Sequence, residues 1–122
     1  MSTIAIVGVG LIGGSLGLAF RRAGVGRILG VSRPETLREA VRLGAIDEGV
    51  PYGKMGDVLG EAEVVFLCTP VHRILELLPE VLGMVKEGAV VTDVGSTKER
   101  ILACAEENLR GGVAFVGGHP MA

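Results

Sequence analysis

The sequence has very few aromatic residues: no tryptophan, one tyrosine and three phenylalanines among its 122 residues. A core without large rings has to be filled by aliphatic side chains and glycine, and this composition is typical of a parallel sheet covered by helices. Apolar residues make up 48% of the chain, which is enough to bury a core at this length. We therefore expect one domain, residues 1–122.

The chain also has few cysteines and a small net charge. Cys68 and Cys104 have no metal-ligand spacing and lie in apolar stretches, so we expect buried free thiols, no metal and a reducing, cytoplasmic location. The formal charge of -2 gives no electrostatic reason to bind nucleic acid or an anionic membrane. No apolar run approaches the ~20 residues that span a bilayer, and the first residues lack the basic start of a signal peptide.

The first fourteen residues, MSTIAIVGVGLIGG, contain the strongest motif. Residues 3–7 form an apolar, β-branched run that is typical of a strand buried on both faces. Gly8, Gly10 and Gly13 follow with G-x-G-x-x-G spacing, and residues 15–22 predict a helix. In dinucleotide-binding turns the first glycine permits the tight turn, the second lets the backbone approach a pyrophosphate, and the third allows close helix–strand packing. An ordinary strand–helix turn would leave this spacing unexplained, so the motif predicts a dinucleotide site.

Strand and helix patterns alternate along the rest of the chain. Five further strands are predicted: over residues 27–31, a short one within 45–51, and over 63–68, 89–94 and 113–116. Helices are predicted from Pro34 to Gly44, in one or two turns within 54–60, along the apolar stripe 74–85 with a kink or break near Pro79, and over 97–109. This alternation predicts an α/β, Rossmann-type doubly wound parallel sheet with strand order 3-2-1-4-5-6.

The residues after the second strand indicate the cofactor. Sites for NAD usually carry Asp or Glu there, about 20 residues past the glycines, to bind the ribose hydroxyls. This chain has Ser32 at that point, followed by Arg33. The small hydroxyl leaves room for a 2′-phosphate and the guanidinium can pair with it, so we predict that NADP is preferred over NAD. The alternative is that Arg33 is a solvated loop residue.

Polar residues also follow three later strands, at the edge where ligands of such sheets bind. Thr69 can donate a hydrogen bond to the cofactor. Asp93 either contacts the cofactor or serves as a turn or capping residue, and Ser96 either lies in the site or caps the next helix. His119 follows the last strand and is a candidate base for alcohol oxidation, because imidazole titrates near working pH. His72 is expected to be an exposed bystander.

Four segments together resemble the prephenate and arogenate dehydrogenases of tyrosine biosynthesis: GVGLIGGSL at 8–16, CTP at 68–70, TDVGSTK at 92–98 and GGHPMA at 117–122. The likeness spans the chain, and the last segment is specific. It implies an oxidative decarboxylation of prephenate or arogenate with hydride transfer to NAD(P)+. His119 matches the residue that accepts the proton of the ring hydroxyl, and Ser96 matches the residue that orients that hydroxyl and the histidine.

The resemblance also implies partners. Members of this family carry a second, all-helical domain that dimerises and binds substrate; we expect that domain to be missing here, so that this chain alone binds cofactor without turnover. Other interpretations are a β-hydroxyacid dehydrogenase or a non-catalytic NAD(P) sensor. The residues expected at the cofactor are Gly8, Gly10, Leu11, Ile12, Gly13, Ser32, Arg33, Cys68, Thr69, Pro70, Asp93 and Gly95.

Overall fold

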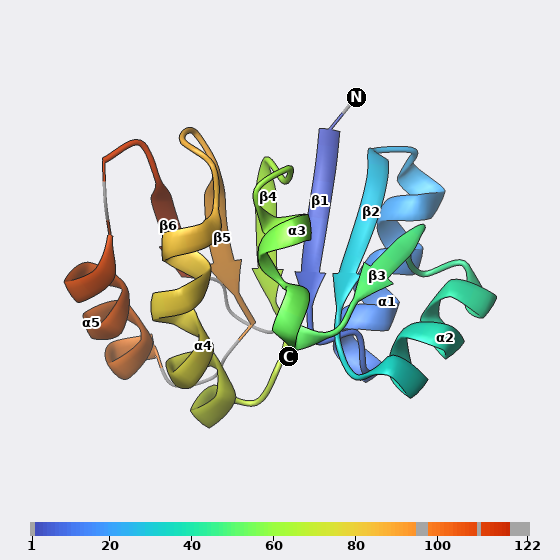
Figure 1. Cartoon of the computed structure of the whole chain (residues 1–122), viewed down its shortest axis with the longest axis horizontal. Coiled ribbons are helices and arrows are strands. Elements are labelled where there is room, and N and C mark those ends of the chain that lie inside the picture. The colour runs from blue at the N-terminus through green and yellow to red at the C-terminus, as the bar shows by residue number, and fades with distance from the viewer. Residues whose placement is uncertain (1, 95–97, 110, 118–122) are drawn as a thin grey trace.

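The computed structural model describes residues 2–94, 98–109 and 111–117. Within these residues six parallel strands form one sheet, in the order β3-β2-β1-β4-β5-β6 (Figure 1). The strands are β1 (Ser2–Val7), β2 (Gly26–Val31), β3 (Glu48–Val50), β4 (Val64–Leu67), β5 (Val90–Asp93) and β6 (Ala114–Gly117). The doubly wound order predicted from the alternation of elements is confirmed.

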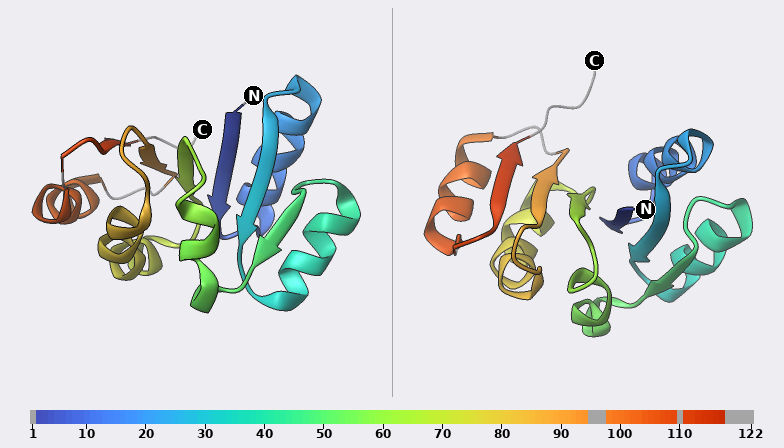
Figure 2. Two further views of the ribbon diagram at one scale, coloured as in Figure 1. Left: turned by 45° about the horizontal axis from the view of Figure 1, so that its top comes forward. Right: turned by 90° about the horizontal axis from the view of Figure 1, so that it is seen from above.

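Helices cover both faces of this sheet (Figure 2). On one face lie α1 (Leu11–Ala23) and α2 (Pro34–Leu43); on the other lie the 3-10 turn η1 (Tyr52–Lys54), α3 (Gly56–Leu59), α4 (Val71–Met84) and α5 (Lys98–Asn108). This division follows from the strand order, because the chain builds outward from β1 to β3 and then crosses back to β4. The segment that follows β1 and the segment that follows β4 therefore lead to opposite faces of the sheet.

The two residues expected at the ends of the second helix, Pro34 and Gly44, lie there. Pro34 is the first residue of α2, and Gly44 ends that helix in the left-handed region, with φ 80°. Gly24 ends α1 in the same way, with φ 67°. The start of α1 differs from the prediction: the helix begins at Leu11, inside the glycine motif, rather than near residue 15.

A kink or a break was predicted near Pro79; α4 continues through this residue, so the break is wrong and the kink stays a prediction. Pro79 has no N–H to give the carbonyl of Leu75, four residues earlier. The Cys104 thiol of α5 donates to that carbonyl instead, with an Sγ–O distance of 3.9 Å. The apolar stripe of α4 packs against the sheet through Ile74, Leu77, Leu78, Val81 and Leu82, which are all buried. Tertiary packing and this neighbouring donor keep the helix continuous.

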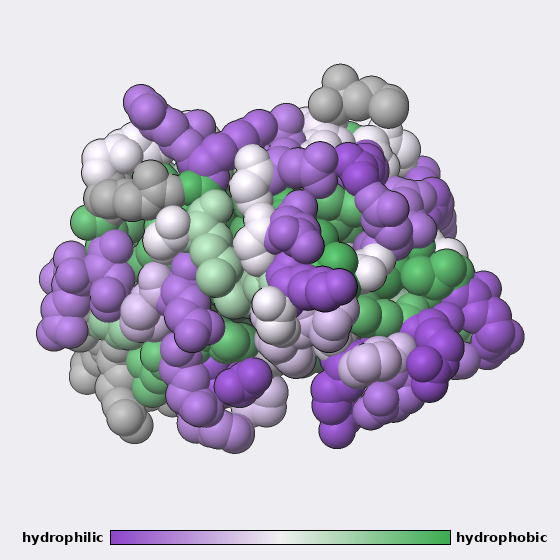
Figure 3. All heavy atoms as spheres, viewed as in Figure 1, coloured by the Kyte–Doolittle hydropathy of each residue, from purple (hydrophilic) through white to green (hydrophobic). Residues whose placement is uncertain are grey.

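The core consists of two apolar layers, one on each face of the sheet. Successive side chains of β1 alternate between them: Ile4 and Ile6 join the layer beneath α1 and α2, while Ala5 and Val7 join the layer beneath the other helices. Hydrophilic side chains cover the outer helices at the two ends of the sheet, with hydrophobic ones showing between them (Figure 3). The central strands are thus buried on both faces, which explains their continuous apolar sequences.

The edge strand β3 is only three residues long. Its first residue, Glu48, forms an ion pair with Arg27 of the neighbouring β2. Pro51 follows its last residue and precedes η1.

Two adjacent glycines of α1 allow a test of the helix–strand packing. A Cβ at Gly13 would collide with the carbonyl oxygen of Gly8, whereas a Cβ at Gly14 would meet only the carbonyl oxygen of Val9, at 3.9 Å. We expect Gly13→Ala to lower the free energy of unfolding by about 1–3 kcal/mol, as overpacking does. Gly14→Ala, the matched control, should raise it by up to about 1 kcal/mol through helix propensity. Urea denaturation of both variants measures this; equal effects would contradict the close packing at Gly13.

Candidate functional site

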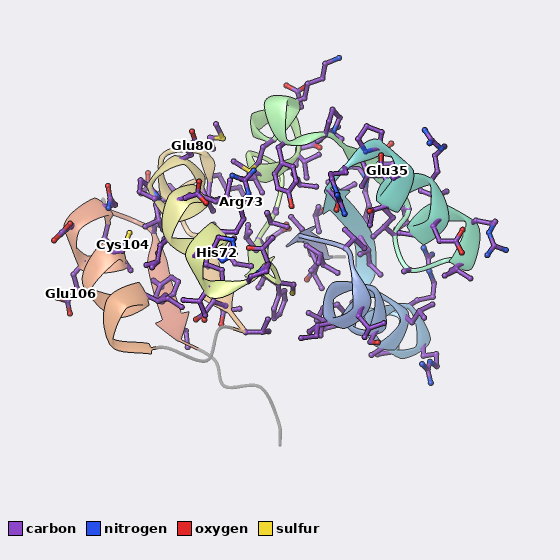
Figure 4. All side chains as sticks on the ribbon, turned by 90° about the horizontal axis from the view of Figure 1, so that it is seen from below. Glu35, His72, Arg73, Glu80, Cys104 and Glu106 are labelled. Carbon is purple, nitrogen blue, oxygen red and sulfur yellow. The ribbon has the colours of Figure 1, made fainter. Side chains whose placement is uncertain are left out.

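The carboxyl ends of β1, β2 and β4 meet at a cleft of about 530 Å³. The segments that follow β1 and β4 turn toward opposite faces of the sheet, and the cleft lies between them. Open α/β sheets bind their ligands at such a point, where the strand order reverses. Figure 4 views this edge, with α4 on one side of the gap and α2 on the other. The lining residues are Gly8, Gly10, Ser32, Arg33, Thr36, Tyr52, Cys68, Thr69, Pro70, His72 and Arg73.

The glycine-rich turn forms the floor of the cleft. Gly8 has φ 91°, which side chains rarely tolerate, and its N–H donates to the carbonyl of Val31 at 2.7 Å. A Cβ at Gly10 would have no heavy atom within 4 Å. The floor at Gly10 is therefore open, and a ligand can approach the backbone there more closely than any side chain would allow.

The helix that starts at this floor presents uncapped backbone donors. Gly10 precedes the first residue of α1, and no side chain caps the helix there. The first turn carries Leu11, which is 92% exposed, and Ile12, which is also exposed. Unpaired N–H groups and the positive end of the helix dipole favour an anion at this position.

The end of β2 supplies a serine and an exposed guanidinium. Ser32 is only 6% exposed, and it lines the cleft. Arg33 is exposed, stands at the N-cap of α2 without capping it, and lies 3.8 Å from the carboxylate of Glu35. Among the described residues, the side chains that line the cleft include the cationic Arg33 and Arg73 and no carboxylate.

The end of β4 supplies the opposite wall. The Oγ1 atom of Thr69 is buried and, in the part of the chain that the structure describes, has no hydrogen-bond partner. Beside it, burial and the negative charge of Asp93 raise the pKa of the Cys68 thiol to about 12. Cys68 is thus a neutral, half-buried thiol rather than a nucleophile at neutral pH.

Three lining residues were missed by sequence reasoning: Thr36, Tyr52 and Arg73. None belongs to a spaced motif, although Arg73 lies in the first turn after Thr69 and Pro70, where a helix meets the ligand edge of the sheet. His72 is exposed, as expected, but it also lines the cleft, so it is not a distant bystander.

The structure describes only some of the site residues predicted at and after the ends of β5 and β6. Asp93 is the last residue of β5 and is 1% exposed, opposite Gly117 in the register of β5 and β6. Gly95, Ser96 and His119 lie outside the described residues.

The described residues offer little support for other classes of site. A second hollow of about 500 Å³ lies between α1 and α2, but its lining is largely aliphatic and adds the carboxylates of Glu35 and Glu39, which disfavour a phosphate. Among residues 2–94, 98–109 and 111–117, no group of three or more His, Cys, Asp or Glu is placed to hold a metal ion. No helix in those ranges is long and apolar enough to cross a bilayer.

Comparisons with known proteins agree with this geometry. Residues 16–122 match the family model described as prephenate dehydrogenase, nucleotide-binding domain. The prephenate dehydrogenase of Lactococcus lactis subsp. cremoris is 39% identical over 125 residues, which cover 100% of this chain and 34% of that protein. The chain thus spans about a third of the length of the curated relatives it matches.

Solved structures show the same likeness. Prephenate dehydrogenase from A. aeolicus, in complex with hydroxyphenyl propionate and NAD+, superposes with a TM-score of 0.87 at 39% identity, covering 99% of this chain and 42% of that one. Synechocystis arogenate dehydrogenase gives a TM-score of 0.84 at 39% identity, covering 97% and 40%.

The unpartnered hydroxyl of Thr69 predicts a measurable gain in stability when it is removed. Thr69→Val keeps the side-chain shape but deletes the buried oxygen, so we expect the free energy of unfolding to rise by about 1–3 kcal/mol. Thr92→Val, on the half-buried β5, is the control and should change stability less, because the Thr92 oxygen is not a buried, unpaired atom. A destabilised Thr69→Val protein would show that the hydroxyl has a partner after all.

Proposed function

The chain belongs to the prephenate dehydrogenase family, as its nucleotide-binding domain, and from this premise we propose that its cleft binds a nicotinamide dinucleotide for the oxidation of prephenate or arogenate. The observation that carries the proposal is the open floor at Gly10, placed between the uncapped start of α1 and the ends of β2 and β4. The NAD+ in the A. aeolicus relative supports the class of ligand.

The residues of the cleft fit such a cofactor. A Cβ at Gly10 would meet no heavy atom within 4 Å, and Gly10 lines the cleft, so there is room for a pyrophosphate against the backbone. The N-terminus of α1 then offers donors and a positive dipole end to the phosphates. The unpaired Thr69 Oγ1 is a polar group that a bound dinucleotide would satisfy, and the hydroxyl of Ser32 in the cleft lining offers a second one.

The proposed chemistry divides between the cofactor and the protein. A bound nicotinamide would supply the hydride acceptor for an oxidation in which the substrate loses carbon dioxide and its ring becomes aromatic. His119 accepts the proton of the ring hydroxyl, and Ser96 orients that hydroxyl and the imidazole. Both roles rest on the match of these residues to the family motifs.

Turnover requires more chain than this. Because the curated relatives are about three times as long, we propose that the rest of such a protein supplies the substrate-binding groups and the dimer contacts. This chain alone then binds the cofactor and turns over prephenate or arogenate negligibly. The enzyme as a whole is proposed to be a cytoplasmic homodimer.

We propose further that NADP is preferred over NAD. The support is local: Ser32 and Arg33 give a hydroxyl and a guanidinium at the end of β2, and the described residues that line the cleft include no carboxylate. The carboxylate of Glu35 lies 3.8 Å from the Arg33 guanidinium and competes with a 2′-phosphate for it, but both side chains are exposed, so that pair is weak.

Calorimetric titration of NADP+ and NAD+ tests this preference. Ser32→Asp should reverse the order of the two dissociation constants, because a carboxylate repels the 2′-phosphate and binds ribose hydroxyls. We expect NADP+ affinity to fall by about ten- to a hundredfold, the loss of one or two charge-assisted hydrogen bonds. Ser32→Ala is the control: it should weaken NADP+ modestly without favouring NAD+. Equal affinity of the unmodified chain for both cofactors would overturn the preference.

His119 is tested in a protein that joins this domain to the remainder of the relatives' length. His119→Asn keeps a hydrogen-bonding group but cannot accept the proton, so kcat should fall by about 10²–10⁴-fold while cofactor affinity stays unchanged. The rate of the unmodified enzyme should fall at low pH, where imidazole takes up a proton. A stable variant with near-normal kcat would remove His119 from the mechanism.

A further inference from the structure

One side chain in the cleft, Arg73, is held by two neighbours that the proposed function does not use. Its guanidinium carbon lies 4.9 Å from the centre of the Tyr52 ring, well within the range of a cation–π contact. Its Nη1 lies 3.8 Å from the carboxylate of Glu76, one turn further along α4. Arg73 and Tyr52 come from segments twenty-one residues apart, on α4 and η1, so the pair joins two elements at the mouth of the cleft.

The pair forms one wall of the cleft. The Arg73 side chain is 38% exposed, and both residues line the cleft. The guanidinium lies over the Tyr52 ring, and the same two side chains also line a neighbouring hollow of about 460 Å³ that includes Glu76. Figure 4 shows Arg73 and His72 on the α4 side of the gap, with Glu35 of α2 across from them. Ser32, Arg33 and Thr36 line the facing side.

We propose that the Tyr52–Arg73 pair is the platform on which the adenine ring of the cofactor stacks, an assignment that rests on the proposed dinucleotide function. A guanidinium is planar and stacks on aromatic faces, so it can lie between the Tyr52 ring and a base. The phosphate-binding groups lie elsewhere, at the start of α1 and at Ser32 and Arg33. Glu76 already balances part of the Arg73 charge, which favours a base over a phosphate as its partner.

In this assignment Tyr52 is a positioning residue. Its ring holds the guanidinium in place by a cation–π contact and need not touch the base itself. The hydroxyl of Tyr52 has no part in this contact, so only the ring is required. Arg73 sets affinity for the adenosine half of the cofactor, and the Ser32–Arg33 pair sets the choice between NADP and NAD.

Calorimetry with fragments of the cofactor tests the platform. The probes are 5′-AMP, 2′,5′-ADP and nicotinamide mononucleotide. Arg73→Leu should weaken the two adenine nucleotides by a similar factor, about three- to thirtyfold, and leave nicotinamide mononucleotide unchanged. Arg38→Leu, which removes an exposed charge of α2 outside the cleft, is the matched control and should change none of them.

Substitutions at Arg73 and Tyr52 separate the platform from a phosphate contact and from a structural role. If Arg73→Leu weakens only 2′,5′-ADP and Arg73→Lys restores it, Arg73 binds the phosphate and the assignment is wrong. Tyr52→Phe should bind all probes normally, whereas Tyr52→Leu should weaken 5′-AMP without changing nicotinamide mononucleotide or the thermal midpoint of unfolding by a comparable degree. Equal loss of both probes would reduce Tyr52 to a structural role.

Binding to the unmodified chain distinguishes a failure of the platform from a failure of the proposed function. If it binds NADP+ and 5′-AMP, and Arg73→Leu binds them equally well, only the platform fails. If it binds no dinucleotide and no fragment, the proposed function fails and the platform with it.

Discussion

The site depends on the close approach of helix α1 to strand β1. Gly13 brings the helix so near to the turn that any side chain there would meet the backbone of Gly8, and Gly17 makes the same approach to the backbone of Ala45. Two contacts of this kind fix the helix along its length against the sheet and against the segment before β3. The start of α1 is thereby held over the end of β1, and its backbone donors point to one defined place.

The three strand ends at the cleft are also joined directly by their backbones. The Gly8 N–H donates to Val31 at the end of β2, and the Cys68 N–H donates to Val7 at the end of β1, at 2.7 and 2.8 Å. These hydrogen bonds hold the three strand ends together at one edge of the sheet, and the segments that follow them diverge from that edge. Ser32 lies on one side of the glycine turn and Thr69 on the other, and the buried Oγ1 of Thr69 has no hydrogen-bond partner among the described residues. A ligand that crosses the turn would meet both.

Sequence reasoning predicted the sheet well because its signals are local. Apolar runs and the glycine spacing depend on neighbouring residues, so the strand order and the turn at Gly8 followed from them. The predicted break at Pro79 was wrong because its remedy, the thiol of Cys104, comes from another helix. Tyr52 and Arg73 were missed for the same reason, since only the folded chain brings them together. The roles of Ser96 and His119 remain predictions from the family motif, as both lie outside the described residues.

The short edge strand β3 has a consequence for how this domain meets other chains. An open sheet edge presents unpaired backbone groups that can recruit a further strand and seed aggregation. Here that edge offers only three residues, begins with a charged side chain paired to Arg27, and is followed by Pro51, which has no N–H to donate. Strand addition is therefore disfavoured on the β3 side, so a chain with this much apolar sequence is protected there against edge-to-edge self-association.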